Sequence, residues 1–272
     1  MLELSWHGNA VVGYHTGSVS VLADPYYSRN PDLITLRDEH VLQADAFFVT
    51  HGHFDHVADL GKVLRKNPRR IYLAADTAHH LQHEHRIPGG FLHAVRWGEA
   101  HQLGDLTLTG LPSKHIVFDR PLIKQTLRDL VGHRGRRYRR ELAQSLRENR
   151  QFPMGTCVAW QIEHQGVRVL HLGSLALDPQ QYYVPGMDWL VIPYQGHSRL
   201  HDKAWEAVLE LKPAGIVLHH FDDTFPPISR TVDTEPFVRL MAARRPEIPV
   251  IVPRYHERIE LGEVAAVDGA SA

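Results

Sequence analysis

The segment Ala46-Phe-Phe-Val-Thr-His51-Gly-His53-Phe-Asp55-His56 places four potential metal ligands directly after an apolar run. The run is typical of a buried strand, and a helical pattern of apolar residues begins at Val57. On a turn that leaves a buried strand, the first two histidines can point the same way. The aspartate and the third histidine can then turn toward a second point as the helix begins. This one loop therefore predicts two adjacent metal positions.

A solvated, histidine-rich loop is the ordinary alternative for such a segment. It does not explain why the ligands follow a buried strand, where α/β folds gather their functional residues. The single cysteine, Cys157, excludes a zinc site with two or more thiolates, so histidines and carboxylates must hold any metal. Of the 21 histidines in the chain, those at positions 79, 80, 83 and 85 lie in a polar, helix-like stretch and are expected at the surface.

The 272 residues, 43% of them hydrophobic, suffice for a substantial core. Strand-like runs such as Leu2–Trp6, Trp189–Pro193 and Ile216–His219 interleave with helix-like segments such as 202–211 and 235–245. This alternation predicts an α/β layered fold with mixed sheets in one domain. Periodicity alone leaves both a doubly wound and a sandwich arrangement open.

The sequence balances its charges, with 30 Lys and Arg against 31 Asp and Glu and a formal net charge of -1. This balance disfavours nucleic acid as a general partner. The chain starts without a basic region followed by an apolar one, and no apolar run approaches the roughly 18 residues of a membrane span. We therefore expect a cytoplasmic protein without membrane contact, and the sequence is compatible with a homo-oligomer.

The segment from Arg120 to Arg150 differs in composition, with ten basic and three acidic residues and a local charge of +7. Leucines at helical spacing predict a helical pair joined at residues 132–135. A solvated basic face is one interpretation of this segment. The other is a lid that binds an anion, in which Arg136 and Arg137 contact the substrate.

The motif His51-x-His53-x-Asp55-His56 resembles the signature of the metallo-β-lactamase superfamily residue for residue. The resemblance extends over most of the chain. It implies a four-layer αββα sandwich that forms a single domain over residues 1–272, with the basic helical segment as an insertion at about 119–153.

Three further motifs are similar to those of the same superfamily. Asp24 matches an aspartate that ends a strand and supports the metal loop without binding the metal, and His115, 59 residues after His56, matches the third motif. The segment Leu218-His-His220-Phe-Asp222 is similar to the last motif in the branch that contains ascorbate-6-phosphate lactonase, and this alignment favours His220 over His219. The resemblance implies two ligand sets: His51, His53 and His115 on one ion, and Asp55, His56 and His220 on the other.

The fourth motif departs from the family pattern. Ser174 stands where an aspartate usually bridges both metals, and a neutral serine does not supply that charge. A two-metal site, a mononuclear enzyme and an inactive protein all stay open. Asp178 is a candidate substitute, although an aspartate before a proline is more often a cap or turn residue. His197 is a further candidate ligand or substrate contact.

The resemblance implies hydrolysis without a covalent intermediate. Zinc held by three histidines lowers the pKa of its water to about 7 and supplies hydroxide, with Asp55 as ligand and orienter of the attacking water. Mn²⁺ and Fe²⁺ also suit such ligands. The basic segment favours a small anionic ester, either a phosphorylated lactone or a phosphodiester. An RNA-processing nuclease and a non-catalytic, metal-containing binding protein are the alternatives.

Overall fold

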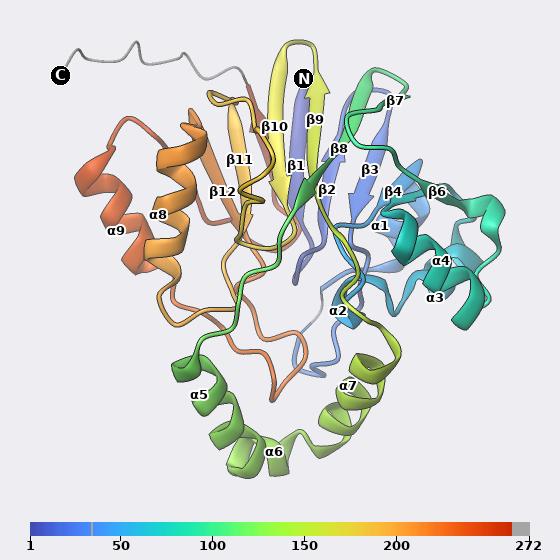
Figure 1. Ribbon diagram of the computed structural model, residues 1–272, viewed down its shortest axis with the longest axis vertical. Helices are drawn as coiled ribbons and strands as arrows, with labels where there is room; N and C mark the ends of the chain where they lie inside the picture. The colour runs from blue at the N-terminus through green and yellow to red at the C-terminus, as the bar shows by residue number, and fades with distance from the viewer. Residues whose placement is uncertain (34, 263–272) are drawn as a thin grey trace.

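Short strands form two seven-stranded mixed sheets in the computed structural model, which describes residues 1–33 and 35–262 (Figure 1). In spatial order, the first sheet consists of β14 (Arg258–Leu261), β1 (Leu2–Trp6), β2 (Val12–His15), β3 (Ser20–Ala23), β4 (Ala46–Phe48), β5 (Ile71–Leu73) and β6 (Leu92–Ala94). The second consists of β13 (Val250–Ile251), β12 (Gly215–His219), β11 (Trp189–Pro193), β10 (Val167–Leu172), β9 (Cys157–His164), β8 (Leu106–Ser113) and β7 (Ala100–Leu103). Residues 263–272 of the predicted domain lie outside the described ranges.

The two sheets pack face to face through one continuous apolar layer. Strand alternation turns Leu4 and Trp6 of β1 inward, where they join Phe48 of β4 and Trp160 of β9. Phe48 and Trp160 are fully buried, with ring centroids 5.3 Å apart. Burial of such large apolar surfaces is the main force that holds the sheets together.

Helices cover the outer face of each sheet. The first sheet packs against α1 (Asp38–Gln43), α2 (Phe54–Val57), α3 (Leu60–Lys66) and α4 (Ala75–Glu84), with the 3-10 turn η1 (Gly89–Phe91) at its edge. The second sheet packs against α8 (Leu200–Leu211) and α9 (Glu235–Arg244). The four layers of the predicted αββα sandwich are thus confirmed. No helix in the described ranges has the length and apolar character needed to cross a bilayer.

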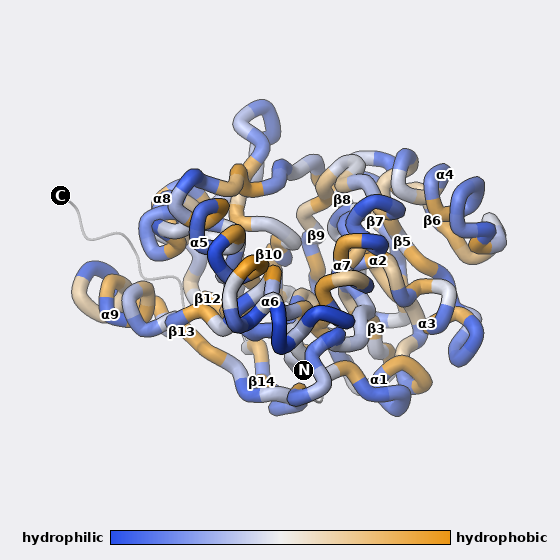
Figure 2. Tube along the Cα trace, turned by 90° about the horizontal axis from the view of Figure 1, so that it is seen from below, coloured by the Kyte–Doolittle hydropathy of each residue, from blue (hydrophilic) through white to orange (hydrophobic). Residues whose placement is uncertain are grey.

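The basic insertion extends between β8 and β9 as an arc of helices at the bottom of Figure 1. It contains α5 (Arg120–Val131), α6 (His133–Arg137) and α7 (Arg139–Gln151). The predicted pair of helices joined at residues 132–135 is therefore wrong, because three helices form. The backbone leaves the helical conformation at Gly132 and again at Tyr138, and the residues between them form a third short helix. Hydrophilic and hydrophobic residues alternate along α5 and α7, whereas α6 is hydrophilic (Figure 2).

The helical pattern that begins at Val57 spans two helices. Val57 ends α2, where the N–H of Ala58 donates to the Phe54 carbonyl oxygen, and α3 begins at Leu60 after Asp59, whose side chain accepts the N–H of Tyr27. The break allows α2 to carry the second half of the histidine motif at its own angle.

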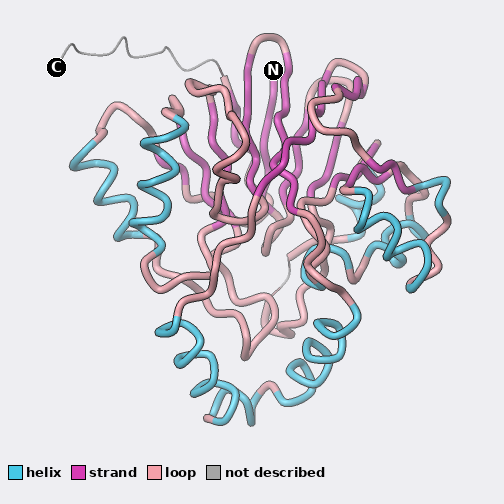
Figure 3. The backbone as a smooth tube through the Cα atoms, in the orientation of Figure 1, coloured by secondary structure: helices cyan, strands magenta, loops and turns pink. Residues whose placement is uncertain are grey.

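Strand direction gathers the motif residues at one edge of the sandwich. β3 and β4 run parallel in the first sheet, and β10, β11 and β12 run parallel in the second. Because β8 and β10 both pair antiparallel with β9, β8 points the same way as β10. The loops that follow these strands meet at the lower edge, facing the insertion (Figure 3).

We expect Phe48→Ala to lower the free energy of unfolding by about 3–5 kcal/mol, because it leaves a cavity between the sheets. Urea denaturation followed by circular dichroism measures the change. Leu209→Ala is the matched control, since this side chain on α8 is 51% exposed and its loss should change stability by less than about 0.5 kcal/mol. Equal effects of the two substitutions would contradict the inter-sheet position of Phe48.

Candidate metal centre

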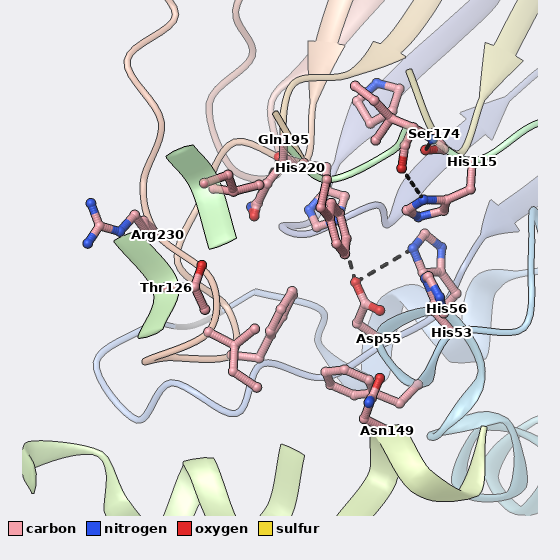
Figure 4. Close-up of a pocket in the computed structure, with 18 of the residues that line it drawn as sticks. His53, Asp55, His56, His115, Thr126, Asn149, Ser174, Gln195, His220 and Arg230 are labelled. Carbon is pink, nitrogen blue, oxygen red and sulfur yellow. Dashed lines mark hydrogen bonds and ion pairs between the residues drawn. The ribbon is translucent and has the colours of Figure 1, made fainter. Parts of the chain in front are cut away.

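Six side chains from three segments of the chain form two adjacent groups at the lower edge of the sandwich. Within each group, the potential ligand atoms all lie within 4.8 Å of one another. The first group comprises His51, His53 and His115, and the second comprises Asp55, His56 and His220. The structure thus brings together both ligand sets implied by the sequence (Figure 4).

In the first group, hydrogen bonds to neighbouring groups determine the tautomers of His115 and His51. Nδ1 of His115 lies 2.8 Å from the carbonyl oxygen of Ile116, so it donates its proton there and Nε2 is left for an ion. Nδ1 of His51 lies 3.0 Å from Oγ1 of Thr50 and likewise leaves Nε2. This Nε2 lies 3.1 Å from Nδ1 of His53, a separation that suits two ligands of one ion.

Asp24 fixes both halves of the metal loop from beneath. Its carboxylate accepts the Thr50 N–H at 2.8 Å and the Thr50 hydroxyl at 2.7 Å. The same carboxylate lies 2.9 Å from Nδ1 of His56, so that Nε2 of this histidine faces the site. Because the only hydroxyl proton of Thr50 goes to Asp24, Thr50 accepts from His51. Asp24 therefore contacts residues of the metal loop and lies outside both ligand groups.

The second group centres on the carboxylate of Asp55. Its Oδ2 atom lies 3.6 Å from Nε2 of His56 and 3.5 Å from Nε2 of His220, as Figure 4 shows. His220 adopts a left-handed backbone conformation (φ 55°), and its N–H donates to the carbonyl oxygen of Asn9. His219, in contrast, is turned into the core, with Nε2 3.1 Å from the Leu172 carbonyl oxygen. The geometry agrees with the choice of His220 over His219.

The histidines of the first group and the carboxylate of Asp55 have the protonation states that a cation requires, whereas Asp24 and Asp55 outweigh burial and raise the pKa of His56. Burial lowers the pKa of His53 to about 4 and that of His51 well below its ordinary value, so both imidazoles are neutral near pH 7. Burial alone would raise the pKa of Asp55, but the imidazoles of His56 and His220 outweigh it and hold the pKa below its ordinary value. Neutral ring nitrogens and an ionised carboxylate fit zinc and similar divalent ions.

Gly52, between the first two histidines, is required by a close approach. Its N–H donates to the Met154 carbonyl oxygen at 2.6 Å, and a Cβ atom here would lie 2.4 Å from the carbonyl oxygen of Pro153. The chain leaving the insertion therefore packs directly on the metal loop.

Ser174 uses its side chain for the neighbouring loop. Its Oγ accepts the N–H of Ile116 at 2.9 Å and so fixes the residue after His115. Asp178 does not replace the usual bridging aspartate: it pairs with Lys114 at 3.3 Å and accepts the Gln180 N–H, as a turn residue does. Neither residue supplies a bridging carboxylate, but both ligand groups form without one.

Three of the sequence-predicted residues lie outside the pocket above the two groups. Arg136 and Arg137 are exposed on α6, and Arg137 pairs with Asp32 at 2.8 Å on the protein surface. Neither arginine lines the pocket, so their contact with a substrate stays a prediction. His197 also lies outside it, 3.8 Å from Asp119.

A pocket of about 320 Å³ lies above both groups, and the sequence analysis missed most of its lining. Apolar side chains of the insertion form one wall, namely Phe118, Leu122, Ile123 and Leu127. Phe118 and Leu127 are 50% and 56% exposed, and the Phe118 ring meets His115 edge-on. Thr126, Asn149, Gln195 and Arg230 add polar groups (Figure 4). The helical spacing of the leucines in the insertion indicates an apolar helix face, but it does not show that this face is turned toward the metal centre.

Thr50 and Asn9 also act on the ligands and were not predicted. Besides its bonds to Asp24 and His51, Thr50 Oγ1 lies 3.2 Å from Nδ1 of His56. Nδ2 of Asn9 donates to the backbone oxygen of Asp55 at 2.6 Å. Thr50 directly precedes the histidine motif, whereas Asn9 lies far from it in the sequence.

The sequence and the fold were compared with known proteins. The profile described as "Beta-lactamase superfamily domain" matches residues 20–221. A UPF0173 metal-dependent hydrolase of Thermococcus onnurineus is 24% identical over 259 residues, which cover 93% of this chain and 97% of that protein.

Solved structures show the same fold. Igni18, a metallo hydrolase from the archaeon Ignicoccus hospitalis, has a TM-score of 0.63 and 20% identity and covers 95% of this chain and 97% of its own. The metallo-β-lactamase fold protein YhfI of Bacillus subtilis has a TM-score of 0.61 and 14% identity and covers 96% of this chain and 100% of its own.

We expect Asp24→Asn to weaken metal binding by about 10–100-fold, because the amide removes the charge that orients His56 and Thr50. Competition with a chromogenic zinc chelator measures the affinity. Asp178→Asn is the control, since it removes a carboxylate that pairs with Lys114 instead of the metal loop. Unchanged zinc affinity in Asp24→Asn would mean that the ligands hold their positions without it.

Proposed function

The chain belongs to the metallo-β-lactamase superfamily, and on that premise we propose that it is a metal-dependent hydrolase of small carboxylic esters or lactones with an apolar substituent. Zinc is the ion that we propose, with one ion in each ligand group, and Mn²⁺ or Fe²⁺ are chemically acceptable. The observation that carries the substrate class is the apolar wall over the metal centre.

This wall consists of apolar side chains that are about half-exposed. Phe118 at 50%, Ile123 at 46% and Leu127 at 56% would all lose solvent contact to a ligand that fills the pocket. Burial of apolar surface contributes roughly 25 cal/mol per Å², so these side chains favour a ligand with an apolar body. The few polar groups among them would fix its orientation.

Ion pairs hold the wall in place on the sandwich. Arg29 binds Glu148 of α7 with two nitrogens, at 3.0 and 3.2 Å, and Asp59 at 2.8 Å. Arg134 of α6 binds Asp223 at 2.8 Å. These pairs bridge the helices to loops near the metal centre, and Arg29 is nearly buried, so its two-pronged contact with Glu148 is well protected from solvent.

The residues would divide the hydrolytic chemistry between them. Metal ions held by the two groups would lower the pKa of water and polarise the carbonyl of the ester. Asp55, kept ionised beside His56 and His220, would orient the attacking water as a hydrogen-bond acceptor. The apolar wall excludes bulk water, which strengthens these electrostatic interactions.

The anionic substrate expected from the basic segment receives less support. Arg230 lines the pocket, but its guanidinium pairs with Asp129 of α5. With Arg134 on Asp223 and Arg137 on Asp32, these arginines make internal ion pairs. A neutral ester or lactone therefore ranks above a phosphodiester, and the same observation counts against a nuclease. The complete ligand groups count against a non-catalytic role.

We expect Phe118→Ala combined with Leu127→Ala to lower kcat/KM for long-chain esters by about tenfold or more, because a lost apolar contact costs that much in a hydrophobic pocket. Acetyl esters should change little, since they do not reach the wall. Steady-state hydrolysis of p-nitrophenyl esters of increasing chain length, with the zinc-loaded enzyme, measures the effect.

The double variant Arg136→Ala with Arg137→Ala is the matched control for this experiment. Both arginines lie on the insertion outside the pocket, so its chain-length profile should follow the wild type. Hydrolysis of phosphodiesters but not of any ester or lactone by the wild-type enzyme would overturn the proposed substrate class.

A further inference from the structure

A second histidine cluster lies on the outer face of the first sheet, where the proposed hydrolysis makes no use of it. His7, His40 and His256 each place a potential ligand atom within 4.8 Å of the other two. A cavity of about 170 Å³ adjoins them, between β1, β2, α1 and the segment before β14. Its lining is largely polar, in contrast to the apolar pocket above the metal centre.

Strand alternation explains why His7 lies on this face. Leu4 and Trp6 point into the core between the sheets, so Ser5 and His7 turn toward the outer side. His7 is nearly inaccessible, because its ring stacks on His40 of α1 with the centroids 3.9 Å apart. A histidine on this buried sheet face therefore contacts other imidazoles instead of apolar side chains.

The ring nitrogens of the cluster are placed as ligands would be. Nδ1 of His7 lies 3.0 Å from Nδ1 of His256, and the other nitrogen of His7 lies 2.9 Å from Oγ of Ser5. The backbone N–H of Arg37 donates to Nδ1 of His40 at 3.2 Å, so Nε2 of the neutral ring carries the proton, and an ion at Nε2 would move that proton to Nδ1 at the cost of the Arg37 bond. Ser5 thus holds the His7 ring by one nitrogen and turns the other toward its partners.

The surrounding residues orient this cluster. Both ring nitrogens of His15 are hydrogen-bonded, one to Ser5 Oγ at 2.7 Å and the other to Ser20 Oγ at 2.9 Å. His15 therefore holds the Ser5 hydroxyl in place. A Cβ atom at Gly13 would lie 2.8 Å from both Ser5 Oγ and the His15 ring, so the space for this arrangement depends on glycine.

His256 is held in a backbone conformation that few residues adopt. Its φ angle is 67°, and its N–H donates to the carbonyl oxygen of Trp6 at 2.7 Å. Left-handed backbone at a residue other than glycine costs free energy and often occurs at ligand-binding positions. Here it directs the imidazole toward His7.

We propose that His7, His40 and His256 bind a divalent transition-metal ion of the zinc type at a site separate from the hydrolytic centre. Three imidazoles suit Zn²⁺, Ni²⁺, Co²⁺ and Cu²⁺. Burial lowers the pKa of His7 to about 2 and that of His40 to about 4, so both rings are neutral and able to bind at neutral pH. Glu39 lines the same cavity, with its carboxylate 3.7 Å from Nε2 of His40, and Arg258 also belongs to the lining.

An ion at this site would join three distant parts of the chain. His7 follows β1, His40 lies in α1, and His256 precedes β14, which pairs with β1. Binding to the native state alone raises the free energy of unfolding, so the ion would act as a structural clamp on the first sheet.

Zinc stoichiometry tests the proposal. Chelator-stripped full-length protein is titrated with Zn²⁺ by isothermal titration calorimetry, with elemental analysis after dialysis. We expect His40→Gln and His256→Asn each to bind one equivalent fewer than the wild type, and asparagine suits the left-handed backbone at position 256. Two variants on separate segments keep the test valid if one fails to fold.

The control is His83→Gln, which removes a histidine of the exposed stretch on α4, where its ring lies 4.2 Å from that of His79. It should bind as much zinc as the wild type. In a His53→Ala background, which keeps the group of Asp55, His56 and His220, zinc should still raise the melting temperature, and adding His40→Gln should make that rise smaller. Wild-type stoichiometry in both cluster variants would overturn the proposal, whatever the state of the hydrolytic centre.

Discussion

The metal centre depends on the hydrogen bonds that the buried carboxylate of Asp24 accepts. A charge removed from water is costly unless every acceptor is satisfied, and this one receives the backbone N–H and hydroxyl of Thr50 and the ring of His56. The loop after β4 therefore has one arrangement in which Asp24 is fully bonded. That arrangement turns the histidines of the motif toward the same space, so the geometry of the ligands follows from the satisfaction of one buried anion.

The local part of this arrangement could be predicted from the sequence. The run before Thr50 and the helical pattern after it predict a strand, a turn and a helix, and they place four ligands on the turn. His115 and His220 required the resemblance to a family, because they lie far away in sequence and meet the loop only where β8 and β12 of the second sheet end. The sandwich arrangement was likewise inferred from the resemblance to the family, since periodicity does not determine how sheets stack.

Other features depend on the orientation of helices, which the sequence pattern does not give. The basic composition of the insertion suggested that its arginines face the substrate, but the helices are placed with their apolar side chains toward the metal centre. Long side chains such as Arg134 reach across to Asp223 on the sandwich instead. The second histidine cluster was equally hidden, because residues 7, 40 and 256 are brought together by the pairing of β1 with β14 and the packing of α1.

The insertion begins and ends at neighbouring points of one hairpin. Ser113 at the end of β8 pairs in register with Cys157 at the start of β9, and the whole helical arc lies between them. Closing a loop across such paired ends costs little more for a long segment than for a short one. Evolution could therefore exchange this cassette for another without redesigning the sandwich, and a lineage could acquire new substrates while inheriting the same catalytic loops.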